Sequence, residues 1–461
     1  MTRRCKWSSS LFPATEAVGV NCLIIAAGKG SRLRSKQDGK PLIRILGVPL
    51  IERVIRSAKA GGADEFIVVT GYGSERLSTF LEALGHRLAV PITTVFNERW
   101  EQENGLSVLR AQNHLTAPFL LLMADHLFDP AIVLNMSGAA PVAGKILLGV
   151  DGDLNNPCVD LQDVTRVWVE GGKILRIGKH LTPHNAFDTG LFLCTPAIFA
   201  AIERSAAACG DTTLSGGVRM LAAEGKANAF DLTGQFWIDV DDPAAFGRAE
   251  SALLRRLVYK PNDGPVARYL NRPISVRISR RLVELPVSPN QISLFSFCCS
   301  LFAAGLFAVG GYPALAAGGL LAQFASVIDG CDGEVARLKY QCSDYGGWFD
   351  AILDRYADAC LLFGLTWHVF SVTGGHWAFV VGFAAVVGSF LNSYTADKYD
   401  GLMARKLGGR PHFRLGRDVR VFVVFLAAVV NLPLVALGAI AIVMNLEVVR
   451  RIVLCARAED A

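Results

Sequence analysis

The stretch that decides the fold is Asp329-Gly330-Cys331-Asp332-Gly333-Glu334-Val335-Ala336-Arg337, followed after eight residues by Gly346, Asp350 and Asp354. It comes directly after residues 285–328, which contain no Asp, Glu, Lys or Arg. A run of this length is enough for two membrane spans of about 20 residues each. Carboxylates at the end of a span are costly without a partner, so the stretch indicates a functional site at membrane depth.

The chain as a whole is apolar for a soluble protein. It has 461 residues, of which 52% are hydrophobic and 19% charged, and its mean hydropathy is +0.36. A single core rarely exceeds roughly 250 to 300 residues, so at least two domains are expected. The apolar excess lies in the last third, where residues 359–396 and 421–446 are also uncharged. We predict an all-α membrane domain, residues 290–455, with six transmembrane helices near 290–310, 313–331, 347–370, 375–396, 418–434 and 435–452.

The first half alternates short apolar runs with helical patterns, as βαβ units do. Two later runs flank Glu170-Gly171-Gly172 and predict a hairpin inserted in the sheet. Asp241 or Asp242 before Pro243 marks the start of a last helix that runs to about residue 256. We expect a Rossmann-like α/β domain with a mostly parallel sheet and a β insertion, residues 21–256, after an N-terminal extension, residues 1–20. The predicted strands are 21–27, 65–70, 118–124, 145–150, 164–169 and 173–177, and the predicted earlier helices include 49–60 and 107–115.

A basic connector, residues 257–289, joins the two predicted domains. Its arginines are expected to meet anionic headgroups on the membrane surface: Arg268, Arg272, Arg277, Arg280 and Arg281. Lysines and arginines also gather in two loops of the membrane domain, after residues 331 and 396, while the opposite loops carry none. This asymmetry predicts a multi-pass protein of the cell inner membrane, with the α/β domain and both termini in the cytoplasm.

Composition also argues against several classes of protein. The eleven cysteines include no C-x-x-C pair, so they indicate neither a zinc module nor a disulfide framework. The net charge of +5 is modest, and the basic residues flank membrane spans, so nucleic-acid binding has no support. Residues 1–20 lack the apolar core of a signal peptide, and no cleaved signal is expected.

The spacing of the aspartates has a geometric meaning. Asp329 and Asp332 stand three residues apart at the end of one predicted helix, and Gly346, Asp350 and Asp354 stand four apart on one face of the next. Four converging carboxylates would repel one another, and two divalent ions are the expected partners. Gly333, Ala336 and Gly346 are small where a nucleotide can lie against the backbone, and Arg337 can reach its phosphates.

The α/β domain has a phosphate-binding pattern of its own. Ala26-Ala27-Gly28-Lys29-Gly30-Ser31-Arg32-Leu33 follows the first predicted strand, and Lys40-Pro41-Leu42 comes shortly after. Gly28, Gly30 and Ser31 allow backbone N–H groups to surround phosphate, while Arg32 and Lys40 supply positive charge against a triphosphate. The third glycine of the dinucleotide fingerprint is replaced by Leu33, so a dinucleotide loop is not indicated.

This combination resembles the nucleotide-sugar-forming nucleotidyltransferases, whose signature is A-x-G-x-G-[ST]-R-[LM] with K-P-L after it. The resemblance implies that Lys40 and Arg32 serve catalysis. It implies Mg²⁺ (or Mn²⁺) on Asp125, Asp239 and Asp241, contacts to base and ribose from Asn104, Gly105 and Ser107, and acceptor binding by Lys179, Asp188 and Thr189. A helix cap at Asp125 and a charged strand edge at the acceptor segment are the alternative structural interpretations.

The stretch around Asp329 follows D-x₂-D-G-x₂-A-R-x₈-G-x₃-D-x₃-D without departure, and resembles the CDP-alcohol phosphotransferases. This resemblance implies that Asp329, Asp332, Asp350 and Asp354 hold Mg²⁺ (or Mn²⁺), and that Asp354 is also the general base. Ser288-Pro289-Asn290 stands where that family has T-P-N.

The two halves together resemble the bifunctional inositol-1-phosphate cytidylyltransferases and di-myo-inositol-phosphate-phosphate synthases. The resemblance implies that CTP and inositol-1-phosphate give CDP-inositol and pyrophosphate, and that phosphoinositol then passes to a second inositol-1-phosphate with release of CMP. It further implies contact with membrane lipids and a homodimer through the membrane domain. Two alternatives stay open: a lipid acceptor in the second step, and a carboxylate-gated transporter with a nucleotide-sensing domain.

Overall fold

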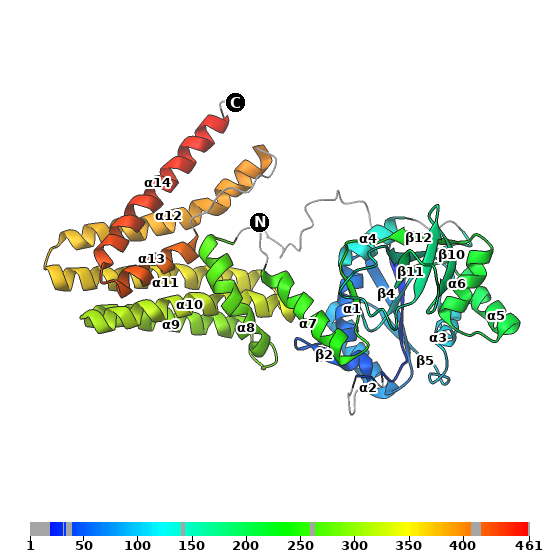
Figure 1. Ribbon diagram of the computed structural model, residues 1–461. Helices are drawn as coiled ribbons and strands as arrows, with labels where there is room; N and C mark the ends of the chain where they lie inside the picture. Colours follow the sequence, from blue (N-terminus) through cyan, green and yellow to red (C-terminus); the bar gives the residue numbers. More distant parts are fainter. Residues whose placement is uncertain are drawn as a thin grey trace. The chain divides into compact units, whose positions relative to one another are not determined.

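The apolar runs of the first half form the strands predicted for them. The computed structural model describes residues 19–30, 32–33, 39–139, 143–258, 263–406 and 416–459. Two compact units divide between Ala252 and Leu253, and both are drawn in Figure 1. Ser31 and nearly all of the predicted N-terminal extension lie outside the described residues.

The first unit is built on a nine-stranded sheet in the order β5-β4-β1-β6-β11-β8-β12-β10-β9. The strands β5, β4, β1 and β6 are parallel, β12 pairs with β8 in parallel, and β11 is antiparallel to both β6 and β8. The expected Rossmann-like sheet is therefore parallel in one half and mixed in the other. Its strands are β1 (Val20–Ala26), β4 (Ala63–Thr70), β5 (Ile92–Phe96), β6 (Phe119–Met123), β8 (Ile146–Asp151), β9 (Arg166–Glu170), β10 (Lys173–Gly178), β11 (Ala186–Cys194) and β12 (Ala227–Asp231).

The predicted hairpin is confirmed as β9 and β10, which pair antiparallel. Gly171 and Gly172 form its turn with φ of +57° and +75°. Two successive residues at positive φ match the twist of the flanking strands, and glycine adopts this conformation at little cost. Two further antiparallel pairs lie outside the main sheet: β2 (Arg44–Ile45) with β3 (Val48–Pro49), and β7 (His126–Phe128) with β13 (Trp237–Asp239).

Helices cover both faces of the main sheet (Figure 1). Apolar residues of α1 (Leu50–Ala60), α2 (Ser74–Leu88) and α4 (Pro130–Gly138) share one core with the sheet. Those of α3 (Asn104–Arg110), α5 (Ala197–Cys209) and α6 (Leu214–Ala223) share the core on the other face. The predicted helix 107–115 is shorter than expected, because α3 ends at Arg110 and a separate 3₁₀ turn follows at Gln112–His114. The last helix, α7 (Pro243–Val258), is capped by Asp242, whose Oδ1 accepts the N–H of Ala245 at 2.7 Å.

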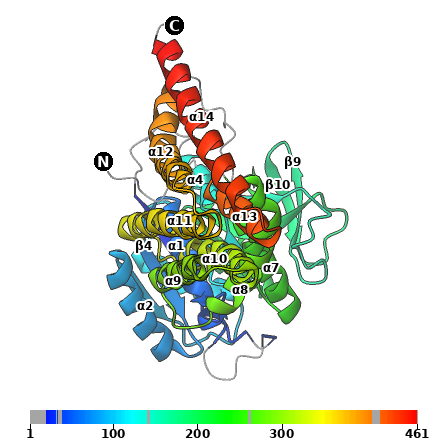
Figure 2. The same cartoon turned by 90° about the vertical axis from the view of Figure 1, so that its left-hand side faces the viewer.

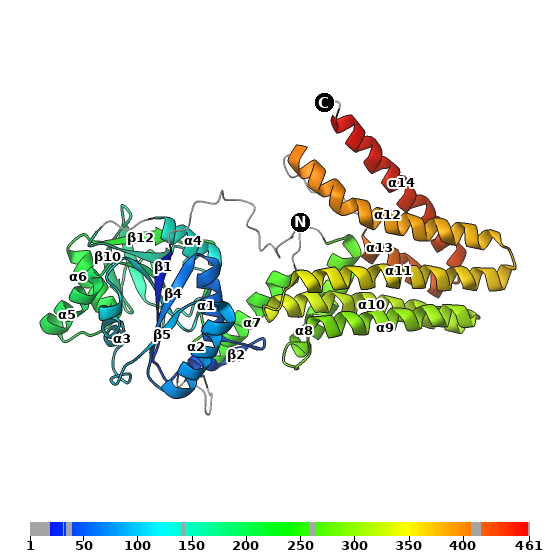
Figure 3. The same ribbon diagram turned by 180° about the vertical axis from the view of Figure 1, so that it is seen from behind.

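The second unit is helical. After a π-helical turn, Ala267–Asn271, come α8 (Arg272–Leu282), α9 (Pro289–Val309), α10 (Tyr312–Leu338), α11 (Asp344–Thr373), α12 (Trp377–Lys406), α13 (Arg417–Val429) and α14 (Pro433–Glu459). Figure 2 looks along α9, α10 and α11 and shows them bundled, with α13 against α10. Figure 3 shows the same three helices side by side along their length. α12 packs on α14.

Three of these helices are long and apolar enough to cross a membrane within the described ranges: α9, α10 and residues Trp377–Ala396 of α12. The positions of the six predicted helices are thus those of α9 to α14, while the crossing of a membrane by each of them stays a prediction. α13 has 13 residues, and at about 1.5 Å per residue it is about 20 Å long, shorter than the roughly 30 Å hydrocarbon core.

The connector is partly buried against the bundle. Arg272, one of the arginines expected to face headgroups, is only 7% exposed, and its guanidinium pairs with Asp263 at 2.8 Å and with Glu334 of α10 at 2.7 Å. Glu334 is fully buried and also accepts the hydroxyls of Ser275 and Ser279 at 2.6 and 2.7 Å. The expectation for Arg272 is therefore wrong: a buried carboxylate needs a paired cation, and α8 supplies it.

Candidate active sites

The phosphate-loop segment brings Lys40 into a group of acidic side chains. Gly30 has φ +65°, and a Cβ there would lie 2.4 Å from the Cβ of Lys40, so only glycine lets the loop pass. The Lys40 Nζ is 2.5 Å from Asp125 Oδ2, bonds Asp241 Oδ1, and lies 3.9 Å from Asp239 Oδ1. Burial opposes the charged ammonium, but the three carboxylates outweigh it and raise the pKa of Lys40. Lys40 is thus a permanent cation.

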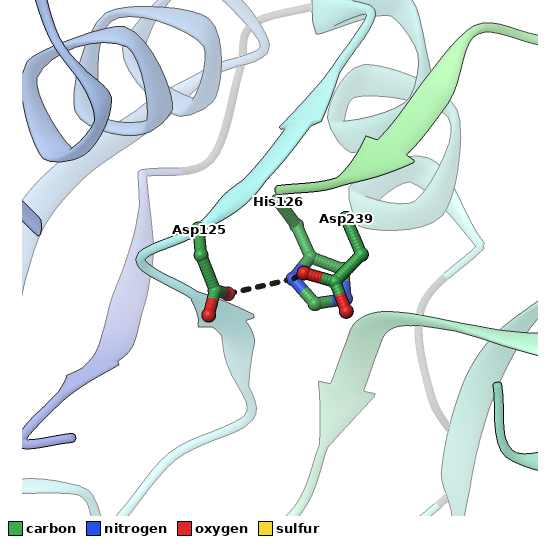
Figure 4. Close-up of side chains that lie close together, drawn as sticks. All are labelled: Asp125, His126 and Asp239. Carbon is green, nitrogen blue, oxygen red and sulfur yellow. Dashed lines mark hydrogen bonds and ion pairs between the residues drawn. The ribbon is translucent and has the colours of Figure 1, made fainter. Parts of the chain in front are cut away.

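Asp125, His126 and Asp239 form the first candidate metal site (Figure 4). Asp125 follows β6, His126 begins β7, and Asp239 lies opposite His126 on β13. The His126 Nδ1 lies 2.8 Å from Asp125 Oδ1 and 3.7 Å from Asp239 Oδ1. Asp239 Oδ1 is buried without a hydrogen-bond partner among the described residues. An unpaired buried oxygen beside a carboxylate and an imidazole fits a divalent cation.

Two details of this group differ from the sequence-based expectation. Asp241 is not among the three; its carboxylate bonds Lys40 and lies 4.0 Å from Arg32, and its role as a metal ligand stays a prediction. His126 was not predicted, although it stands next to Asp125 in the chain. Burial disfavours its imidazolium, but Asp239 and Asp125 outweigh that effect and raise the pKa of His126 to about 9.

A cavity of about 170 Å³ opens beside these residues and is lined by Asn104, His126, Asp163, Lys179, Asp188 and Asp239, among others. Asp163, also not predicted, bonds Arg32 and accepts from Lys179 Nζ at 2.6 Å. The hydrogen bond from Lys179, with that from Arg32, outweighs burial and lowers the pKa of Asp163 to about 2. Two cations predicted for phosphate binding thus meet on one carboxylate at the cavity wall.

The predicted binding residues outside the cavity lining include Gly105, Ser107 and Thr189, which have structural contacts instead. A Cβ on Gly105 would lie 2.3 Å from Thr212 O, so this glycine permits close packing of α3 against the start of α6. The Ser107 hydroxyl is buried and accepts from Asn97 Nδ2 at 2.9 Å. Thr189 is fully buried and donates to Gly149 O at 2.8 Å. Gly28 has no atom within 4 Å of an added Cβ, so the space beside it is open.

We expect Asp188→Asn to stabilise the substrate-free protein above pH 6. Burial raises the pKa of Asp188 to about 6, so the folded state binds this proton more tightly than the unfolded state. Stability then falls as pH rises from about 4 to about 6, by about 1 to 3 kcal/mol, and stays lower above that window. Asparagine can still accept the Gly190 N–H, which donates to Asp188 Oδ1 at 2.8 Å. Thermal unfolding from pH 4 to 8 measures the stability of Asp188→Asn relative to the wild type. If the advantage of the variant became smaller as the pH rises, the raised pKa of Asp188 would be contradicted.

Asp329, Asp350 and Asp354 form the second candidate metal site, between α10 and α11. One carboxylate oxygen from each lies within 4.8 Å of the other two. Asp332 is held beside them: its Oδ2 accepts from Ser293 of α9 at 2.5 Å, and it lies within hydrogen-bond reach of Asp350. The predicted four-residue spacing therefore does group these side chains, and oxygen ligands of this kind suit a hard divalent cation.

The nucleotide-binding residues predicted next to this site include an unpaired donor and two glycines with close neighbours. The Nη2 of Arg337 is buried with no hydrogen-bond partner in the described part of the chain. A Cβ on Gly333 would lie 3.2 Å from Arg337 Nη1, and one on Gly346 would lie 3.0 Å from Ser343 Oγ. Ala336 is buried in the same turn. These features fit a phosphate that approaches the backbone between α10 and α11.

Arginines from the later helices complete the second site. Arg417 of α13 bridges two of its carboxylates, with Nη1 at 2.8 Å from Asp329 Oδ2 and 2.6 Å from Asp354 Oδ1. A cavity of about 180 Å³ adjoins Asp354 and is lined by Asp358, Asn392, Arg417, Arg420 and Arg451, among others. No role was predicted for these arginines, although the R-x-x-R spacing of Arg417 and Arg420 places both on one side of a helix.

Two family models match separate parts of the chain, one for each site. Residues 22–162 match the family model of the MobA-like NTP transferase domain, and residues 286–456 match that of the CDP-alcohol phosphatidyltransferases. A solved structure, the inositol-1-phosphate CTP transferase from T. maritima, matches 50% of this chain and 94% of its own, with 25% identity and a TM-score of 0.46.

Relatives similar over nearly the whole chain are named "bifunctional IPC transferase and DIPP synthase". The protein from Rubrobacter xylanophilus is 37% identical over 94% of this chain and 96% of its own length. The one from Aquifex aeolicus is 31% identical over 94% of this chain and 97% of its own. At this identity and coverage, the chain belongs to the family of bifunctional IPC transferases and DIPP synthases.

Proposed function

We propose that the first site joins CTP and inositol-1-phosphate into CDP-inositol, and that the second transfers phosphoinositol from CDP-inositol to another inositol-1-phosphate. The observation that carries this proposal is the presence of two separate acidic centres in a chain collinear with those relatives. The cavity beside the first includes Lys179, and the cavity beside the second includes four arginines. A transporter with a nucleotide-sensing domain would not require the second centre's small residues or the first centre's buried lysine.

In the first step, an oxygen of the phosphate monoester attacks the α-phosphorus of CTP, and the bond to the β-phosphate breaks to release pyrophosphate. Both reactants are anions, so positive charge must be fixed in place before they meet. Lys40, held by three carboxylates, provides such a charge. Arg32 and Lys179 bond Asp163 in the structure. When substrate binds, they release Asp163 and contact the substrate phosphates instead. Asp188 and Asn104 stand at the cavity to receive polyol hydroxyls and the nucleoside.

In the second step, a hydroxyl of the acceptor attacks the inositol-bearing phosphorus of CDP-inositol, and CMP leaves. Asp354 takes the proton of that hydroxyl, because it borders both the acidic centre and the adjoining cavity. Arg337, with its unpaired Nη2, holds the diphosphate of the donor. The arginines of the cavity receive the phosphate of the acceptor.

A divalent cation, Mg²⁺ or Mn²⁺, would be held by Asp125, His126 and Asp239 at the first site and by Asp329, Asp332, Asp350 and Asp354 at the second. When bound, it would neutralise phosphate charge during transfer. Lys40 pairs with Asp125 of the first centre and Arg417 with Asp354 of the second. Removal of the metal by EDTA should abolish pyrophosphate and CMP release, and added Mg²⁺ or Mn²⁺ should restore both.

The full chain, supplied with CTP and a panel of phosphorylated polyols, tests the function. Pyrophosphate, a CDP-polyol and CMP should appear with inositol-1-phosphate, and mass spectrometry identifies the products. Pyrophosphate that forms with none of the polyol phosphates would overturn the first step. CMP release that requires an added lipid would replace the soluble acceptor by a lipid one.

We further propose that the chain is a multi-pass protein of the inner membrane, with the first unit and both termini in the cytoplasm. A protease added to sealed inside-out vesicles should then cut in the basic segment after residue 396 and leave the loop at Gly374 intact. Cleavage after residue 396 in right-side-out vesicles would contradict this orientation. The proposed homodimer through the second unit predicts twice the mass of one chain in native mass spectrometry.

A further inference from the structure

Asp358 continues the series that places the catalytic carboxylates of α11 on one face. Gly346, Asp350 and Asp354 are four residues apart, and Asp358 follows at the same interval. It lies one helical turn beyond the family signature, which ends at Asp354. The Asp358 side chain is 8% exposed, so its charge has little contact with solvent and needs protein partners.

Two arginines and a serine supply these partners from different helices. Asp358 Oδ1 accepts from Arg417 Nε at 3.1 Å, and Oδ2 accepts from Arg420 Nη2 at 2.7 Å and from Ser389 Oγ of α12 at 3.0 Å. Both arginines belong to the first turn of α13. One carboxylate thus fixes the guanidinium groups of two residues that line the cavity beside Asp354.

The charge and the unpaired atoms of this cavity indicate what it binds. Its lining includes four arginines against two aspartates. The Nε of Arg420 is buried and has no hydrogen-bond partner among the described residues. Because an unpaired buried guanidinium donor is costly, the arrangement favours an anion with several acceptor oxygens.

We propose that Asp358 is a positioning residue for the acceptor phosphate in the second reaction. It holds Arg417 and Arg420 in the orientation that receives this phosphate, and thereby places the attacking hydroxyl next to Asp354. It makes no contact with the reacting atoms itself. This inference rests on the proposed second reaction and adds to it the residue that orients the phosphate-binding arginines.

Asp358→Asn separates this role from general support of the fold. Asparagine has the same shape and still accepts a hydrogen bond, but its neutral amide loses the charge that orients the guanidinium groups. With supplied CDP-inositol, we expect the KM for inositol-1-phosphate to rise about tenfold or more, while the KM for CDP-inositol stays within about twofold. The preference for inositol-1-phosphate over unphosphorylated inositol should fall by the same factor.

Ser389→Ala is the matched control, because it removes the third partner of Asp358 and leaves both arginine contacts in place. It should keep both KM values, and the preference for inositol-1-phosphate over inositol, near those of the wild type. If Asp358→Asn does not accumulate, Arg420→Lys tests the same point: lysine keeps the charge but loses the planar fork, so the acceptor KM should again rise.

An equal rise in the KM values of both substrates in Asp358→Asn would overturn the positioning role. So would an unchanged KM for inositol-1-phosphate in the same variant. A different outcome concerns the proposed function itself. If wild-type protein releases no CMP from CDP-inositol with any polyol phosphate, the second reaction is misassigned, whatever the variants do.

Discussion

Asp354→Asn is expected to stop CMP release while CTP consumption continues, so that CDP-inositol accumulates. The substitution preserves size and helix but removes both the proton acceptor and one carboxylate of the second metal site. Loss of one positioned base typically lowers the rate by about 10² to 10⁴, and a lost metal ligand adds to this. Nucleotide analysis of a reaction with CTP and inositol-1-phosphate measures CTP, CDP-inositol and CMP.

Asp344→Asn provides the control, because Asp344 is an exposed acid on the first turn of the same helix. It should release CMP at the wild-type rate. If Asp354→Asn also releases CMP at that rate from supplied CDP-inositol, Asp354 is structural and another group accepts the proton.

Lys40→Met should have the opposite pattern, with loss of pyrophosphate release and normal turnover of supplied CDP-inositol. Methionine keeps most of the apolar stem of a side chain that is only 7% exposed, but removes the charge. Asp125, Asp239 and Asp241 then lose their common cation, and the triphosphate loses a fixed positive charge. Removal of one such preorganised group typically costs about 10² to 10³ in rate.

Lys59→Met, at the end of α1, changes an exposed lysine in the same unit and should have little effect. Continued CMP release from CDP-inositol shows that the Lys40 variant is folded in the second unit, and thermal unfolding checks the first. Undiminished pyrophosphate release by Lys40→Met would remove Lys40 from the proposed mechanism.

The parts of the fold that depend on local pattern could be predicted from the sequence. The first strand, the hairpin at Gly171 and Gly172, the cap at Asp242 and the spacing of Asp350 and Asp354 each depend on a few neighbouring residues. The pairing of helices with one another could not be predicted in the same way, because apolar helices of similar composition carry no mark of their partners.

The missed site residues have physical explanations. His126 follows Asp125 directly, and successive residues of a strand point to opposite faces, but here β6 has ended and the chain turns into β7. Asp163 meets Arg32 across 131 residues of sequence, from a segment without periodic pattern. Asp358 could have been found from the sequence, because it continues the four-residue spacing of Asp350 and Asp354. It was missed because the family signature ends at Asp354.

Glu334 occupies a position that the signature leaves free, yet its environment restricts it. Arg272, Ser275 and Ser279 all bond its carboxylate, and Arg272 also pairs with Asp263. Loss of one partner from a buried ion pair typically costs about 3 to 5 kcal/mol, so single replacements here are disfavoured unless a neighbour changes too. These five positions should therefore covary among relatives, with apolar residues replacing the whole set where the charge is lost.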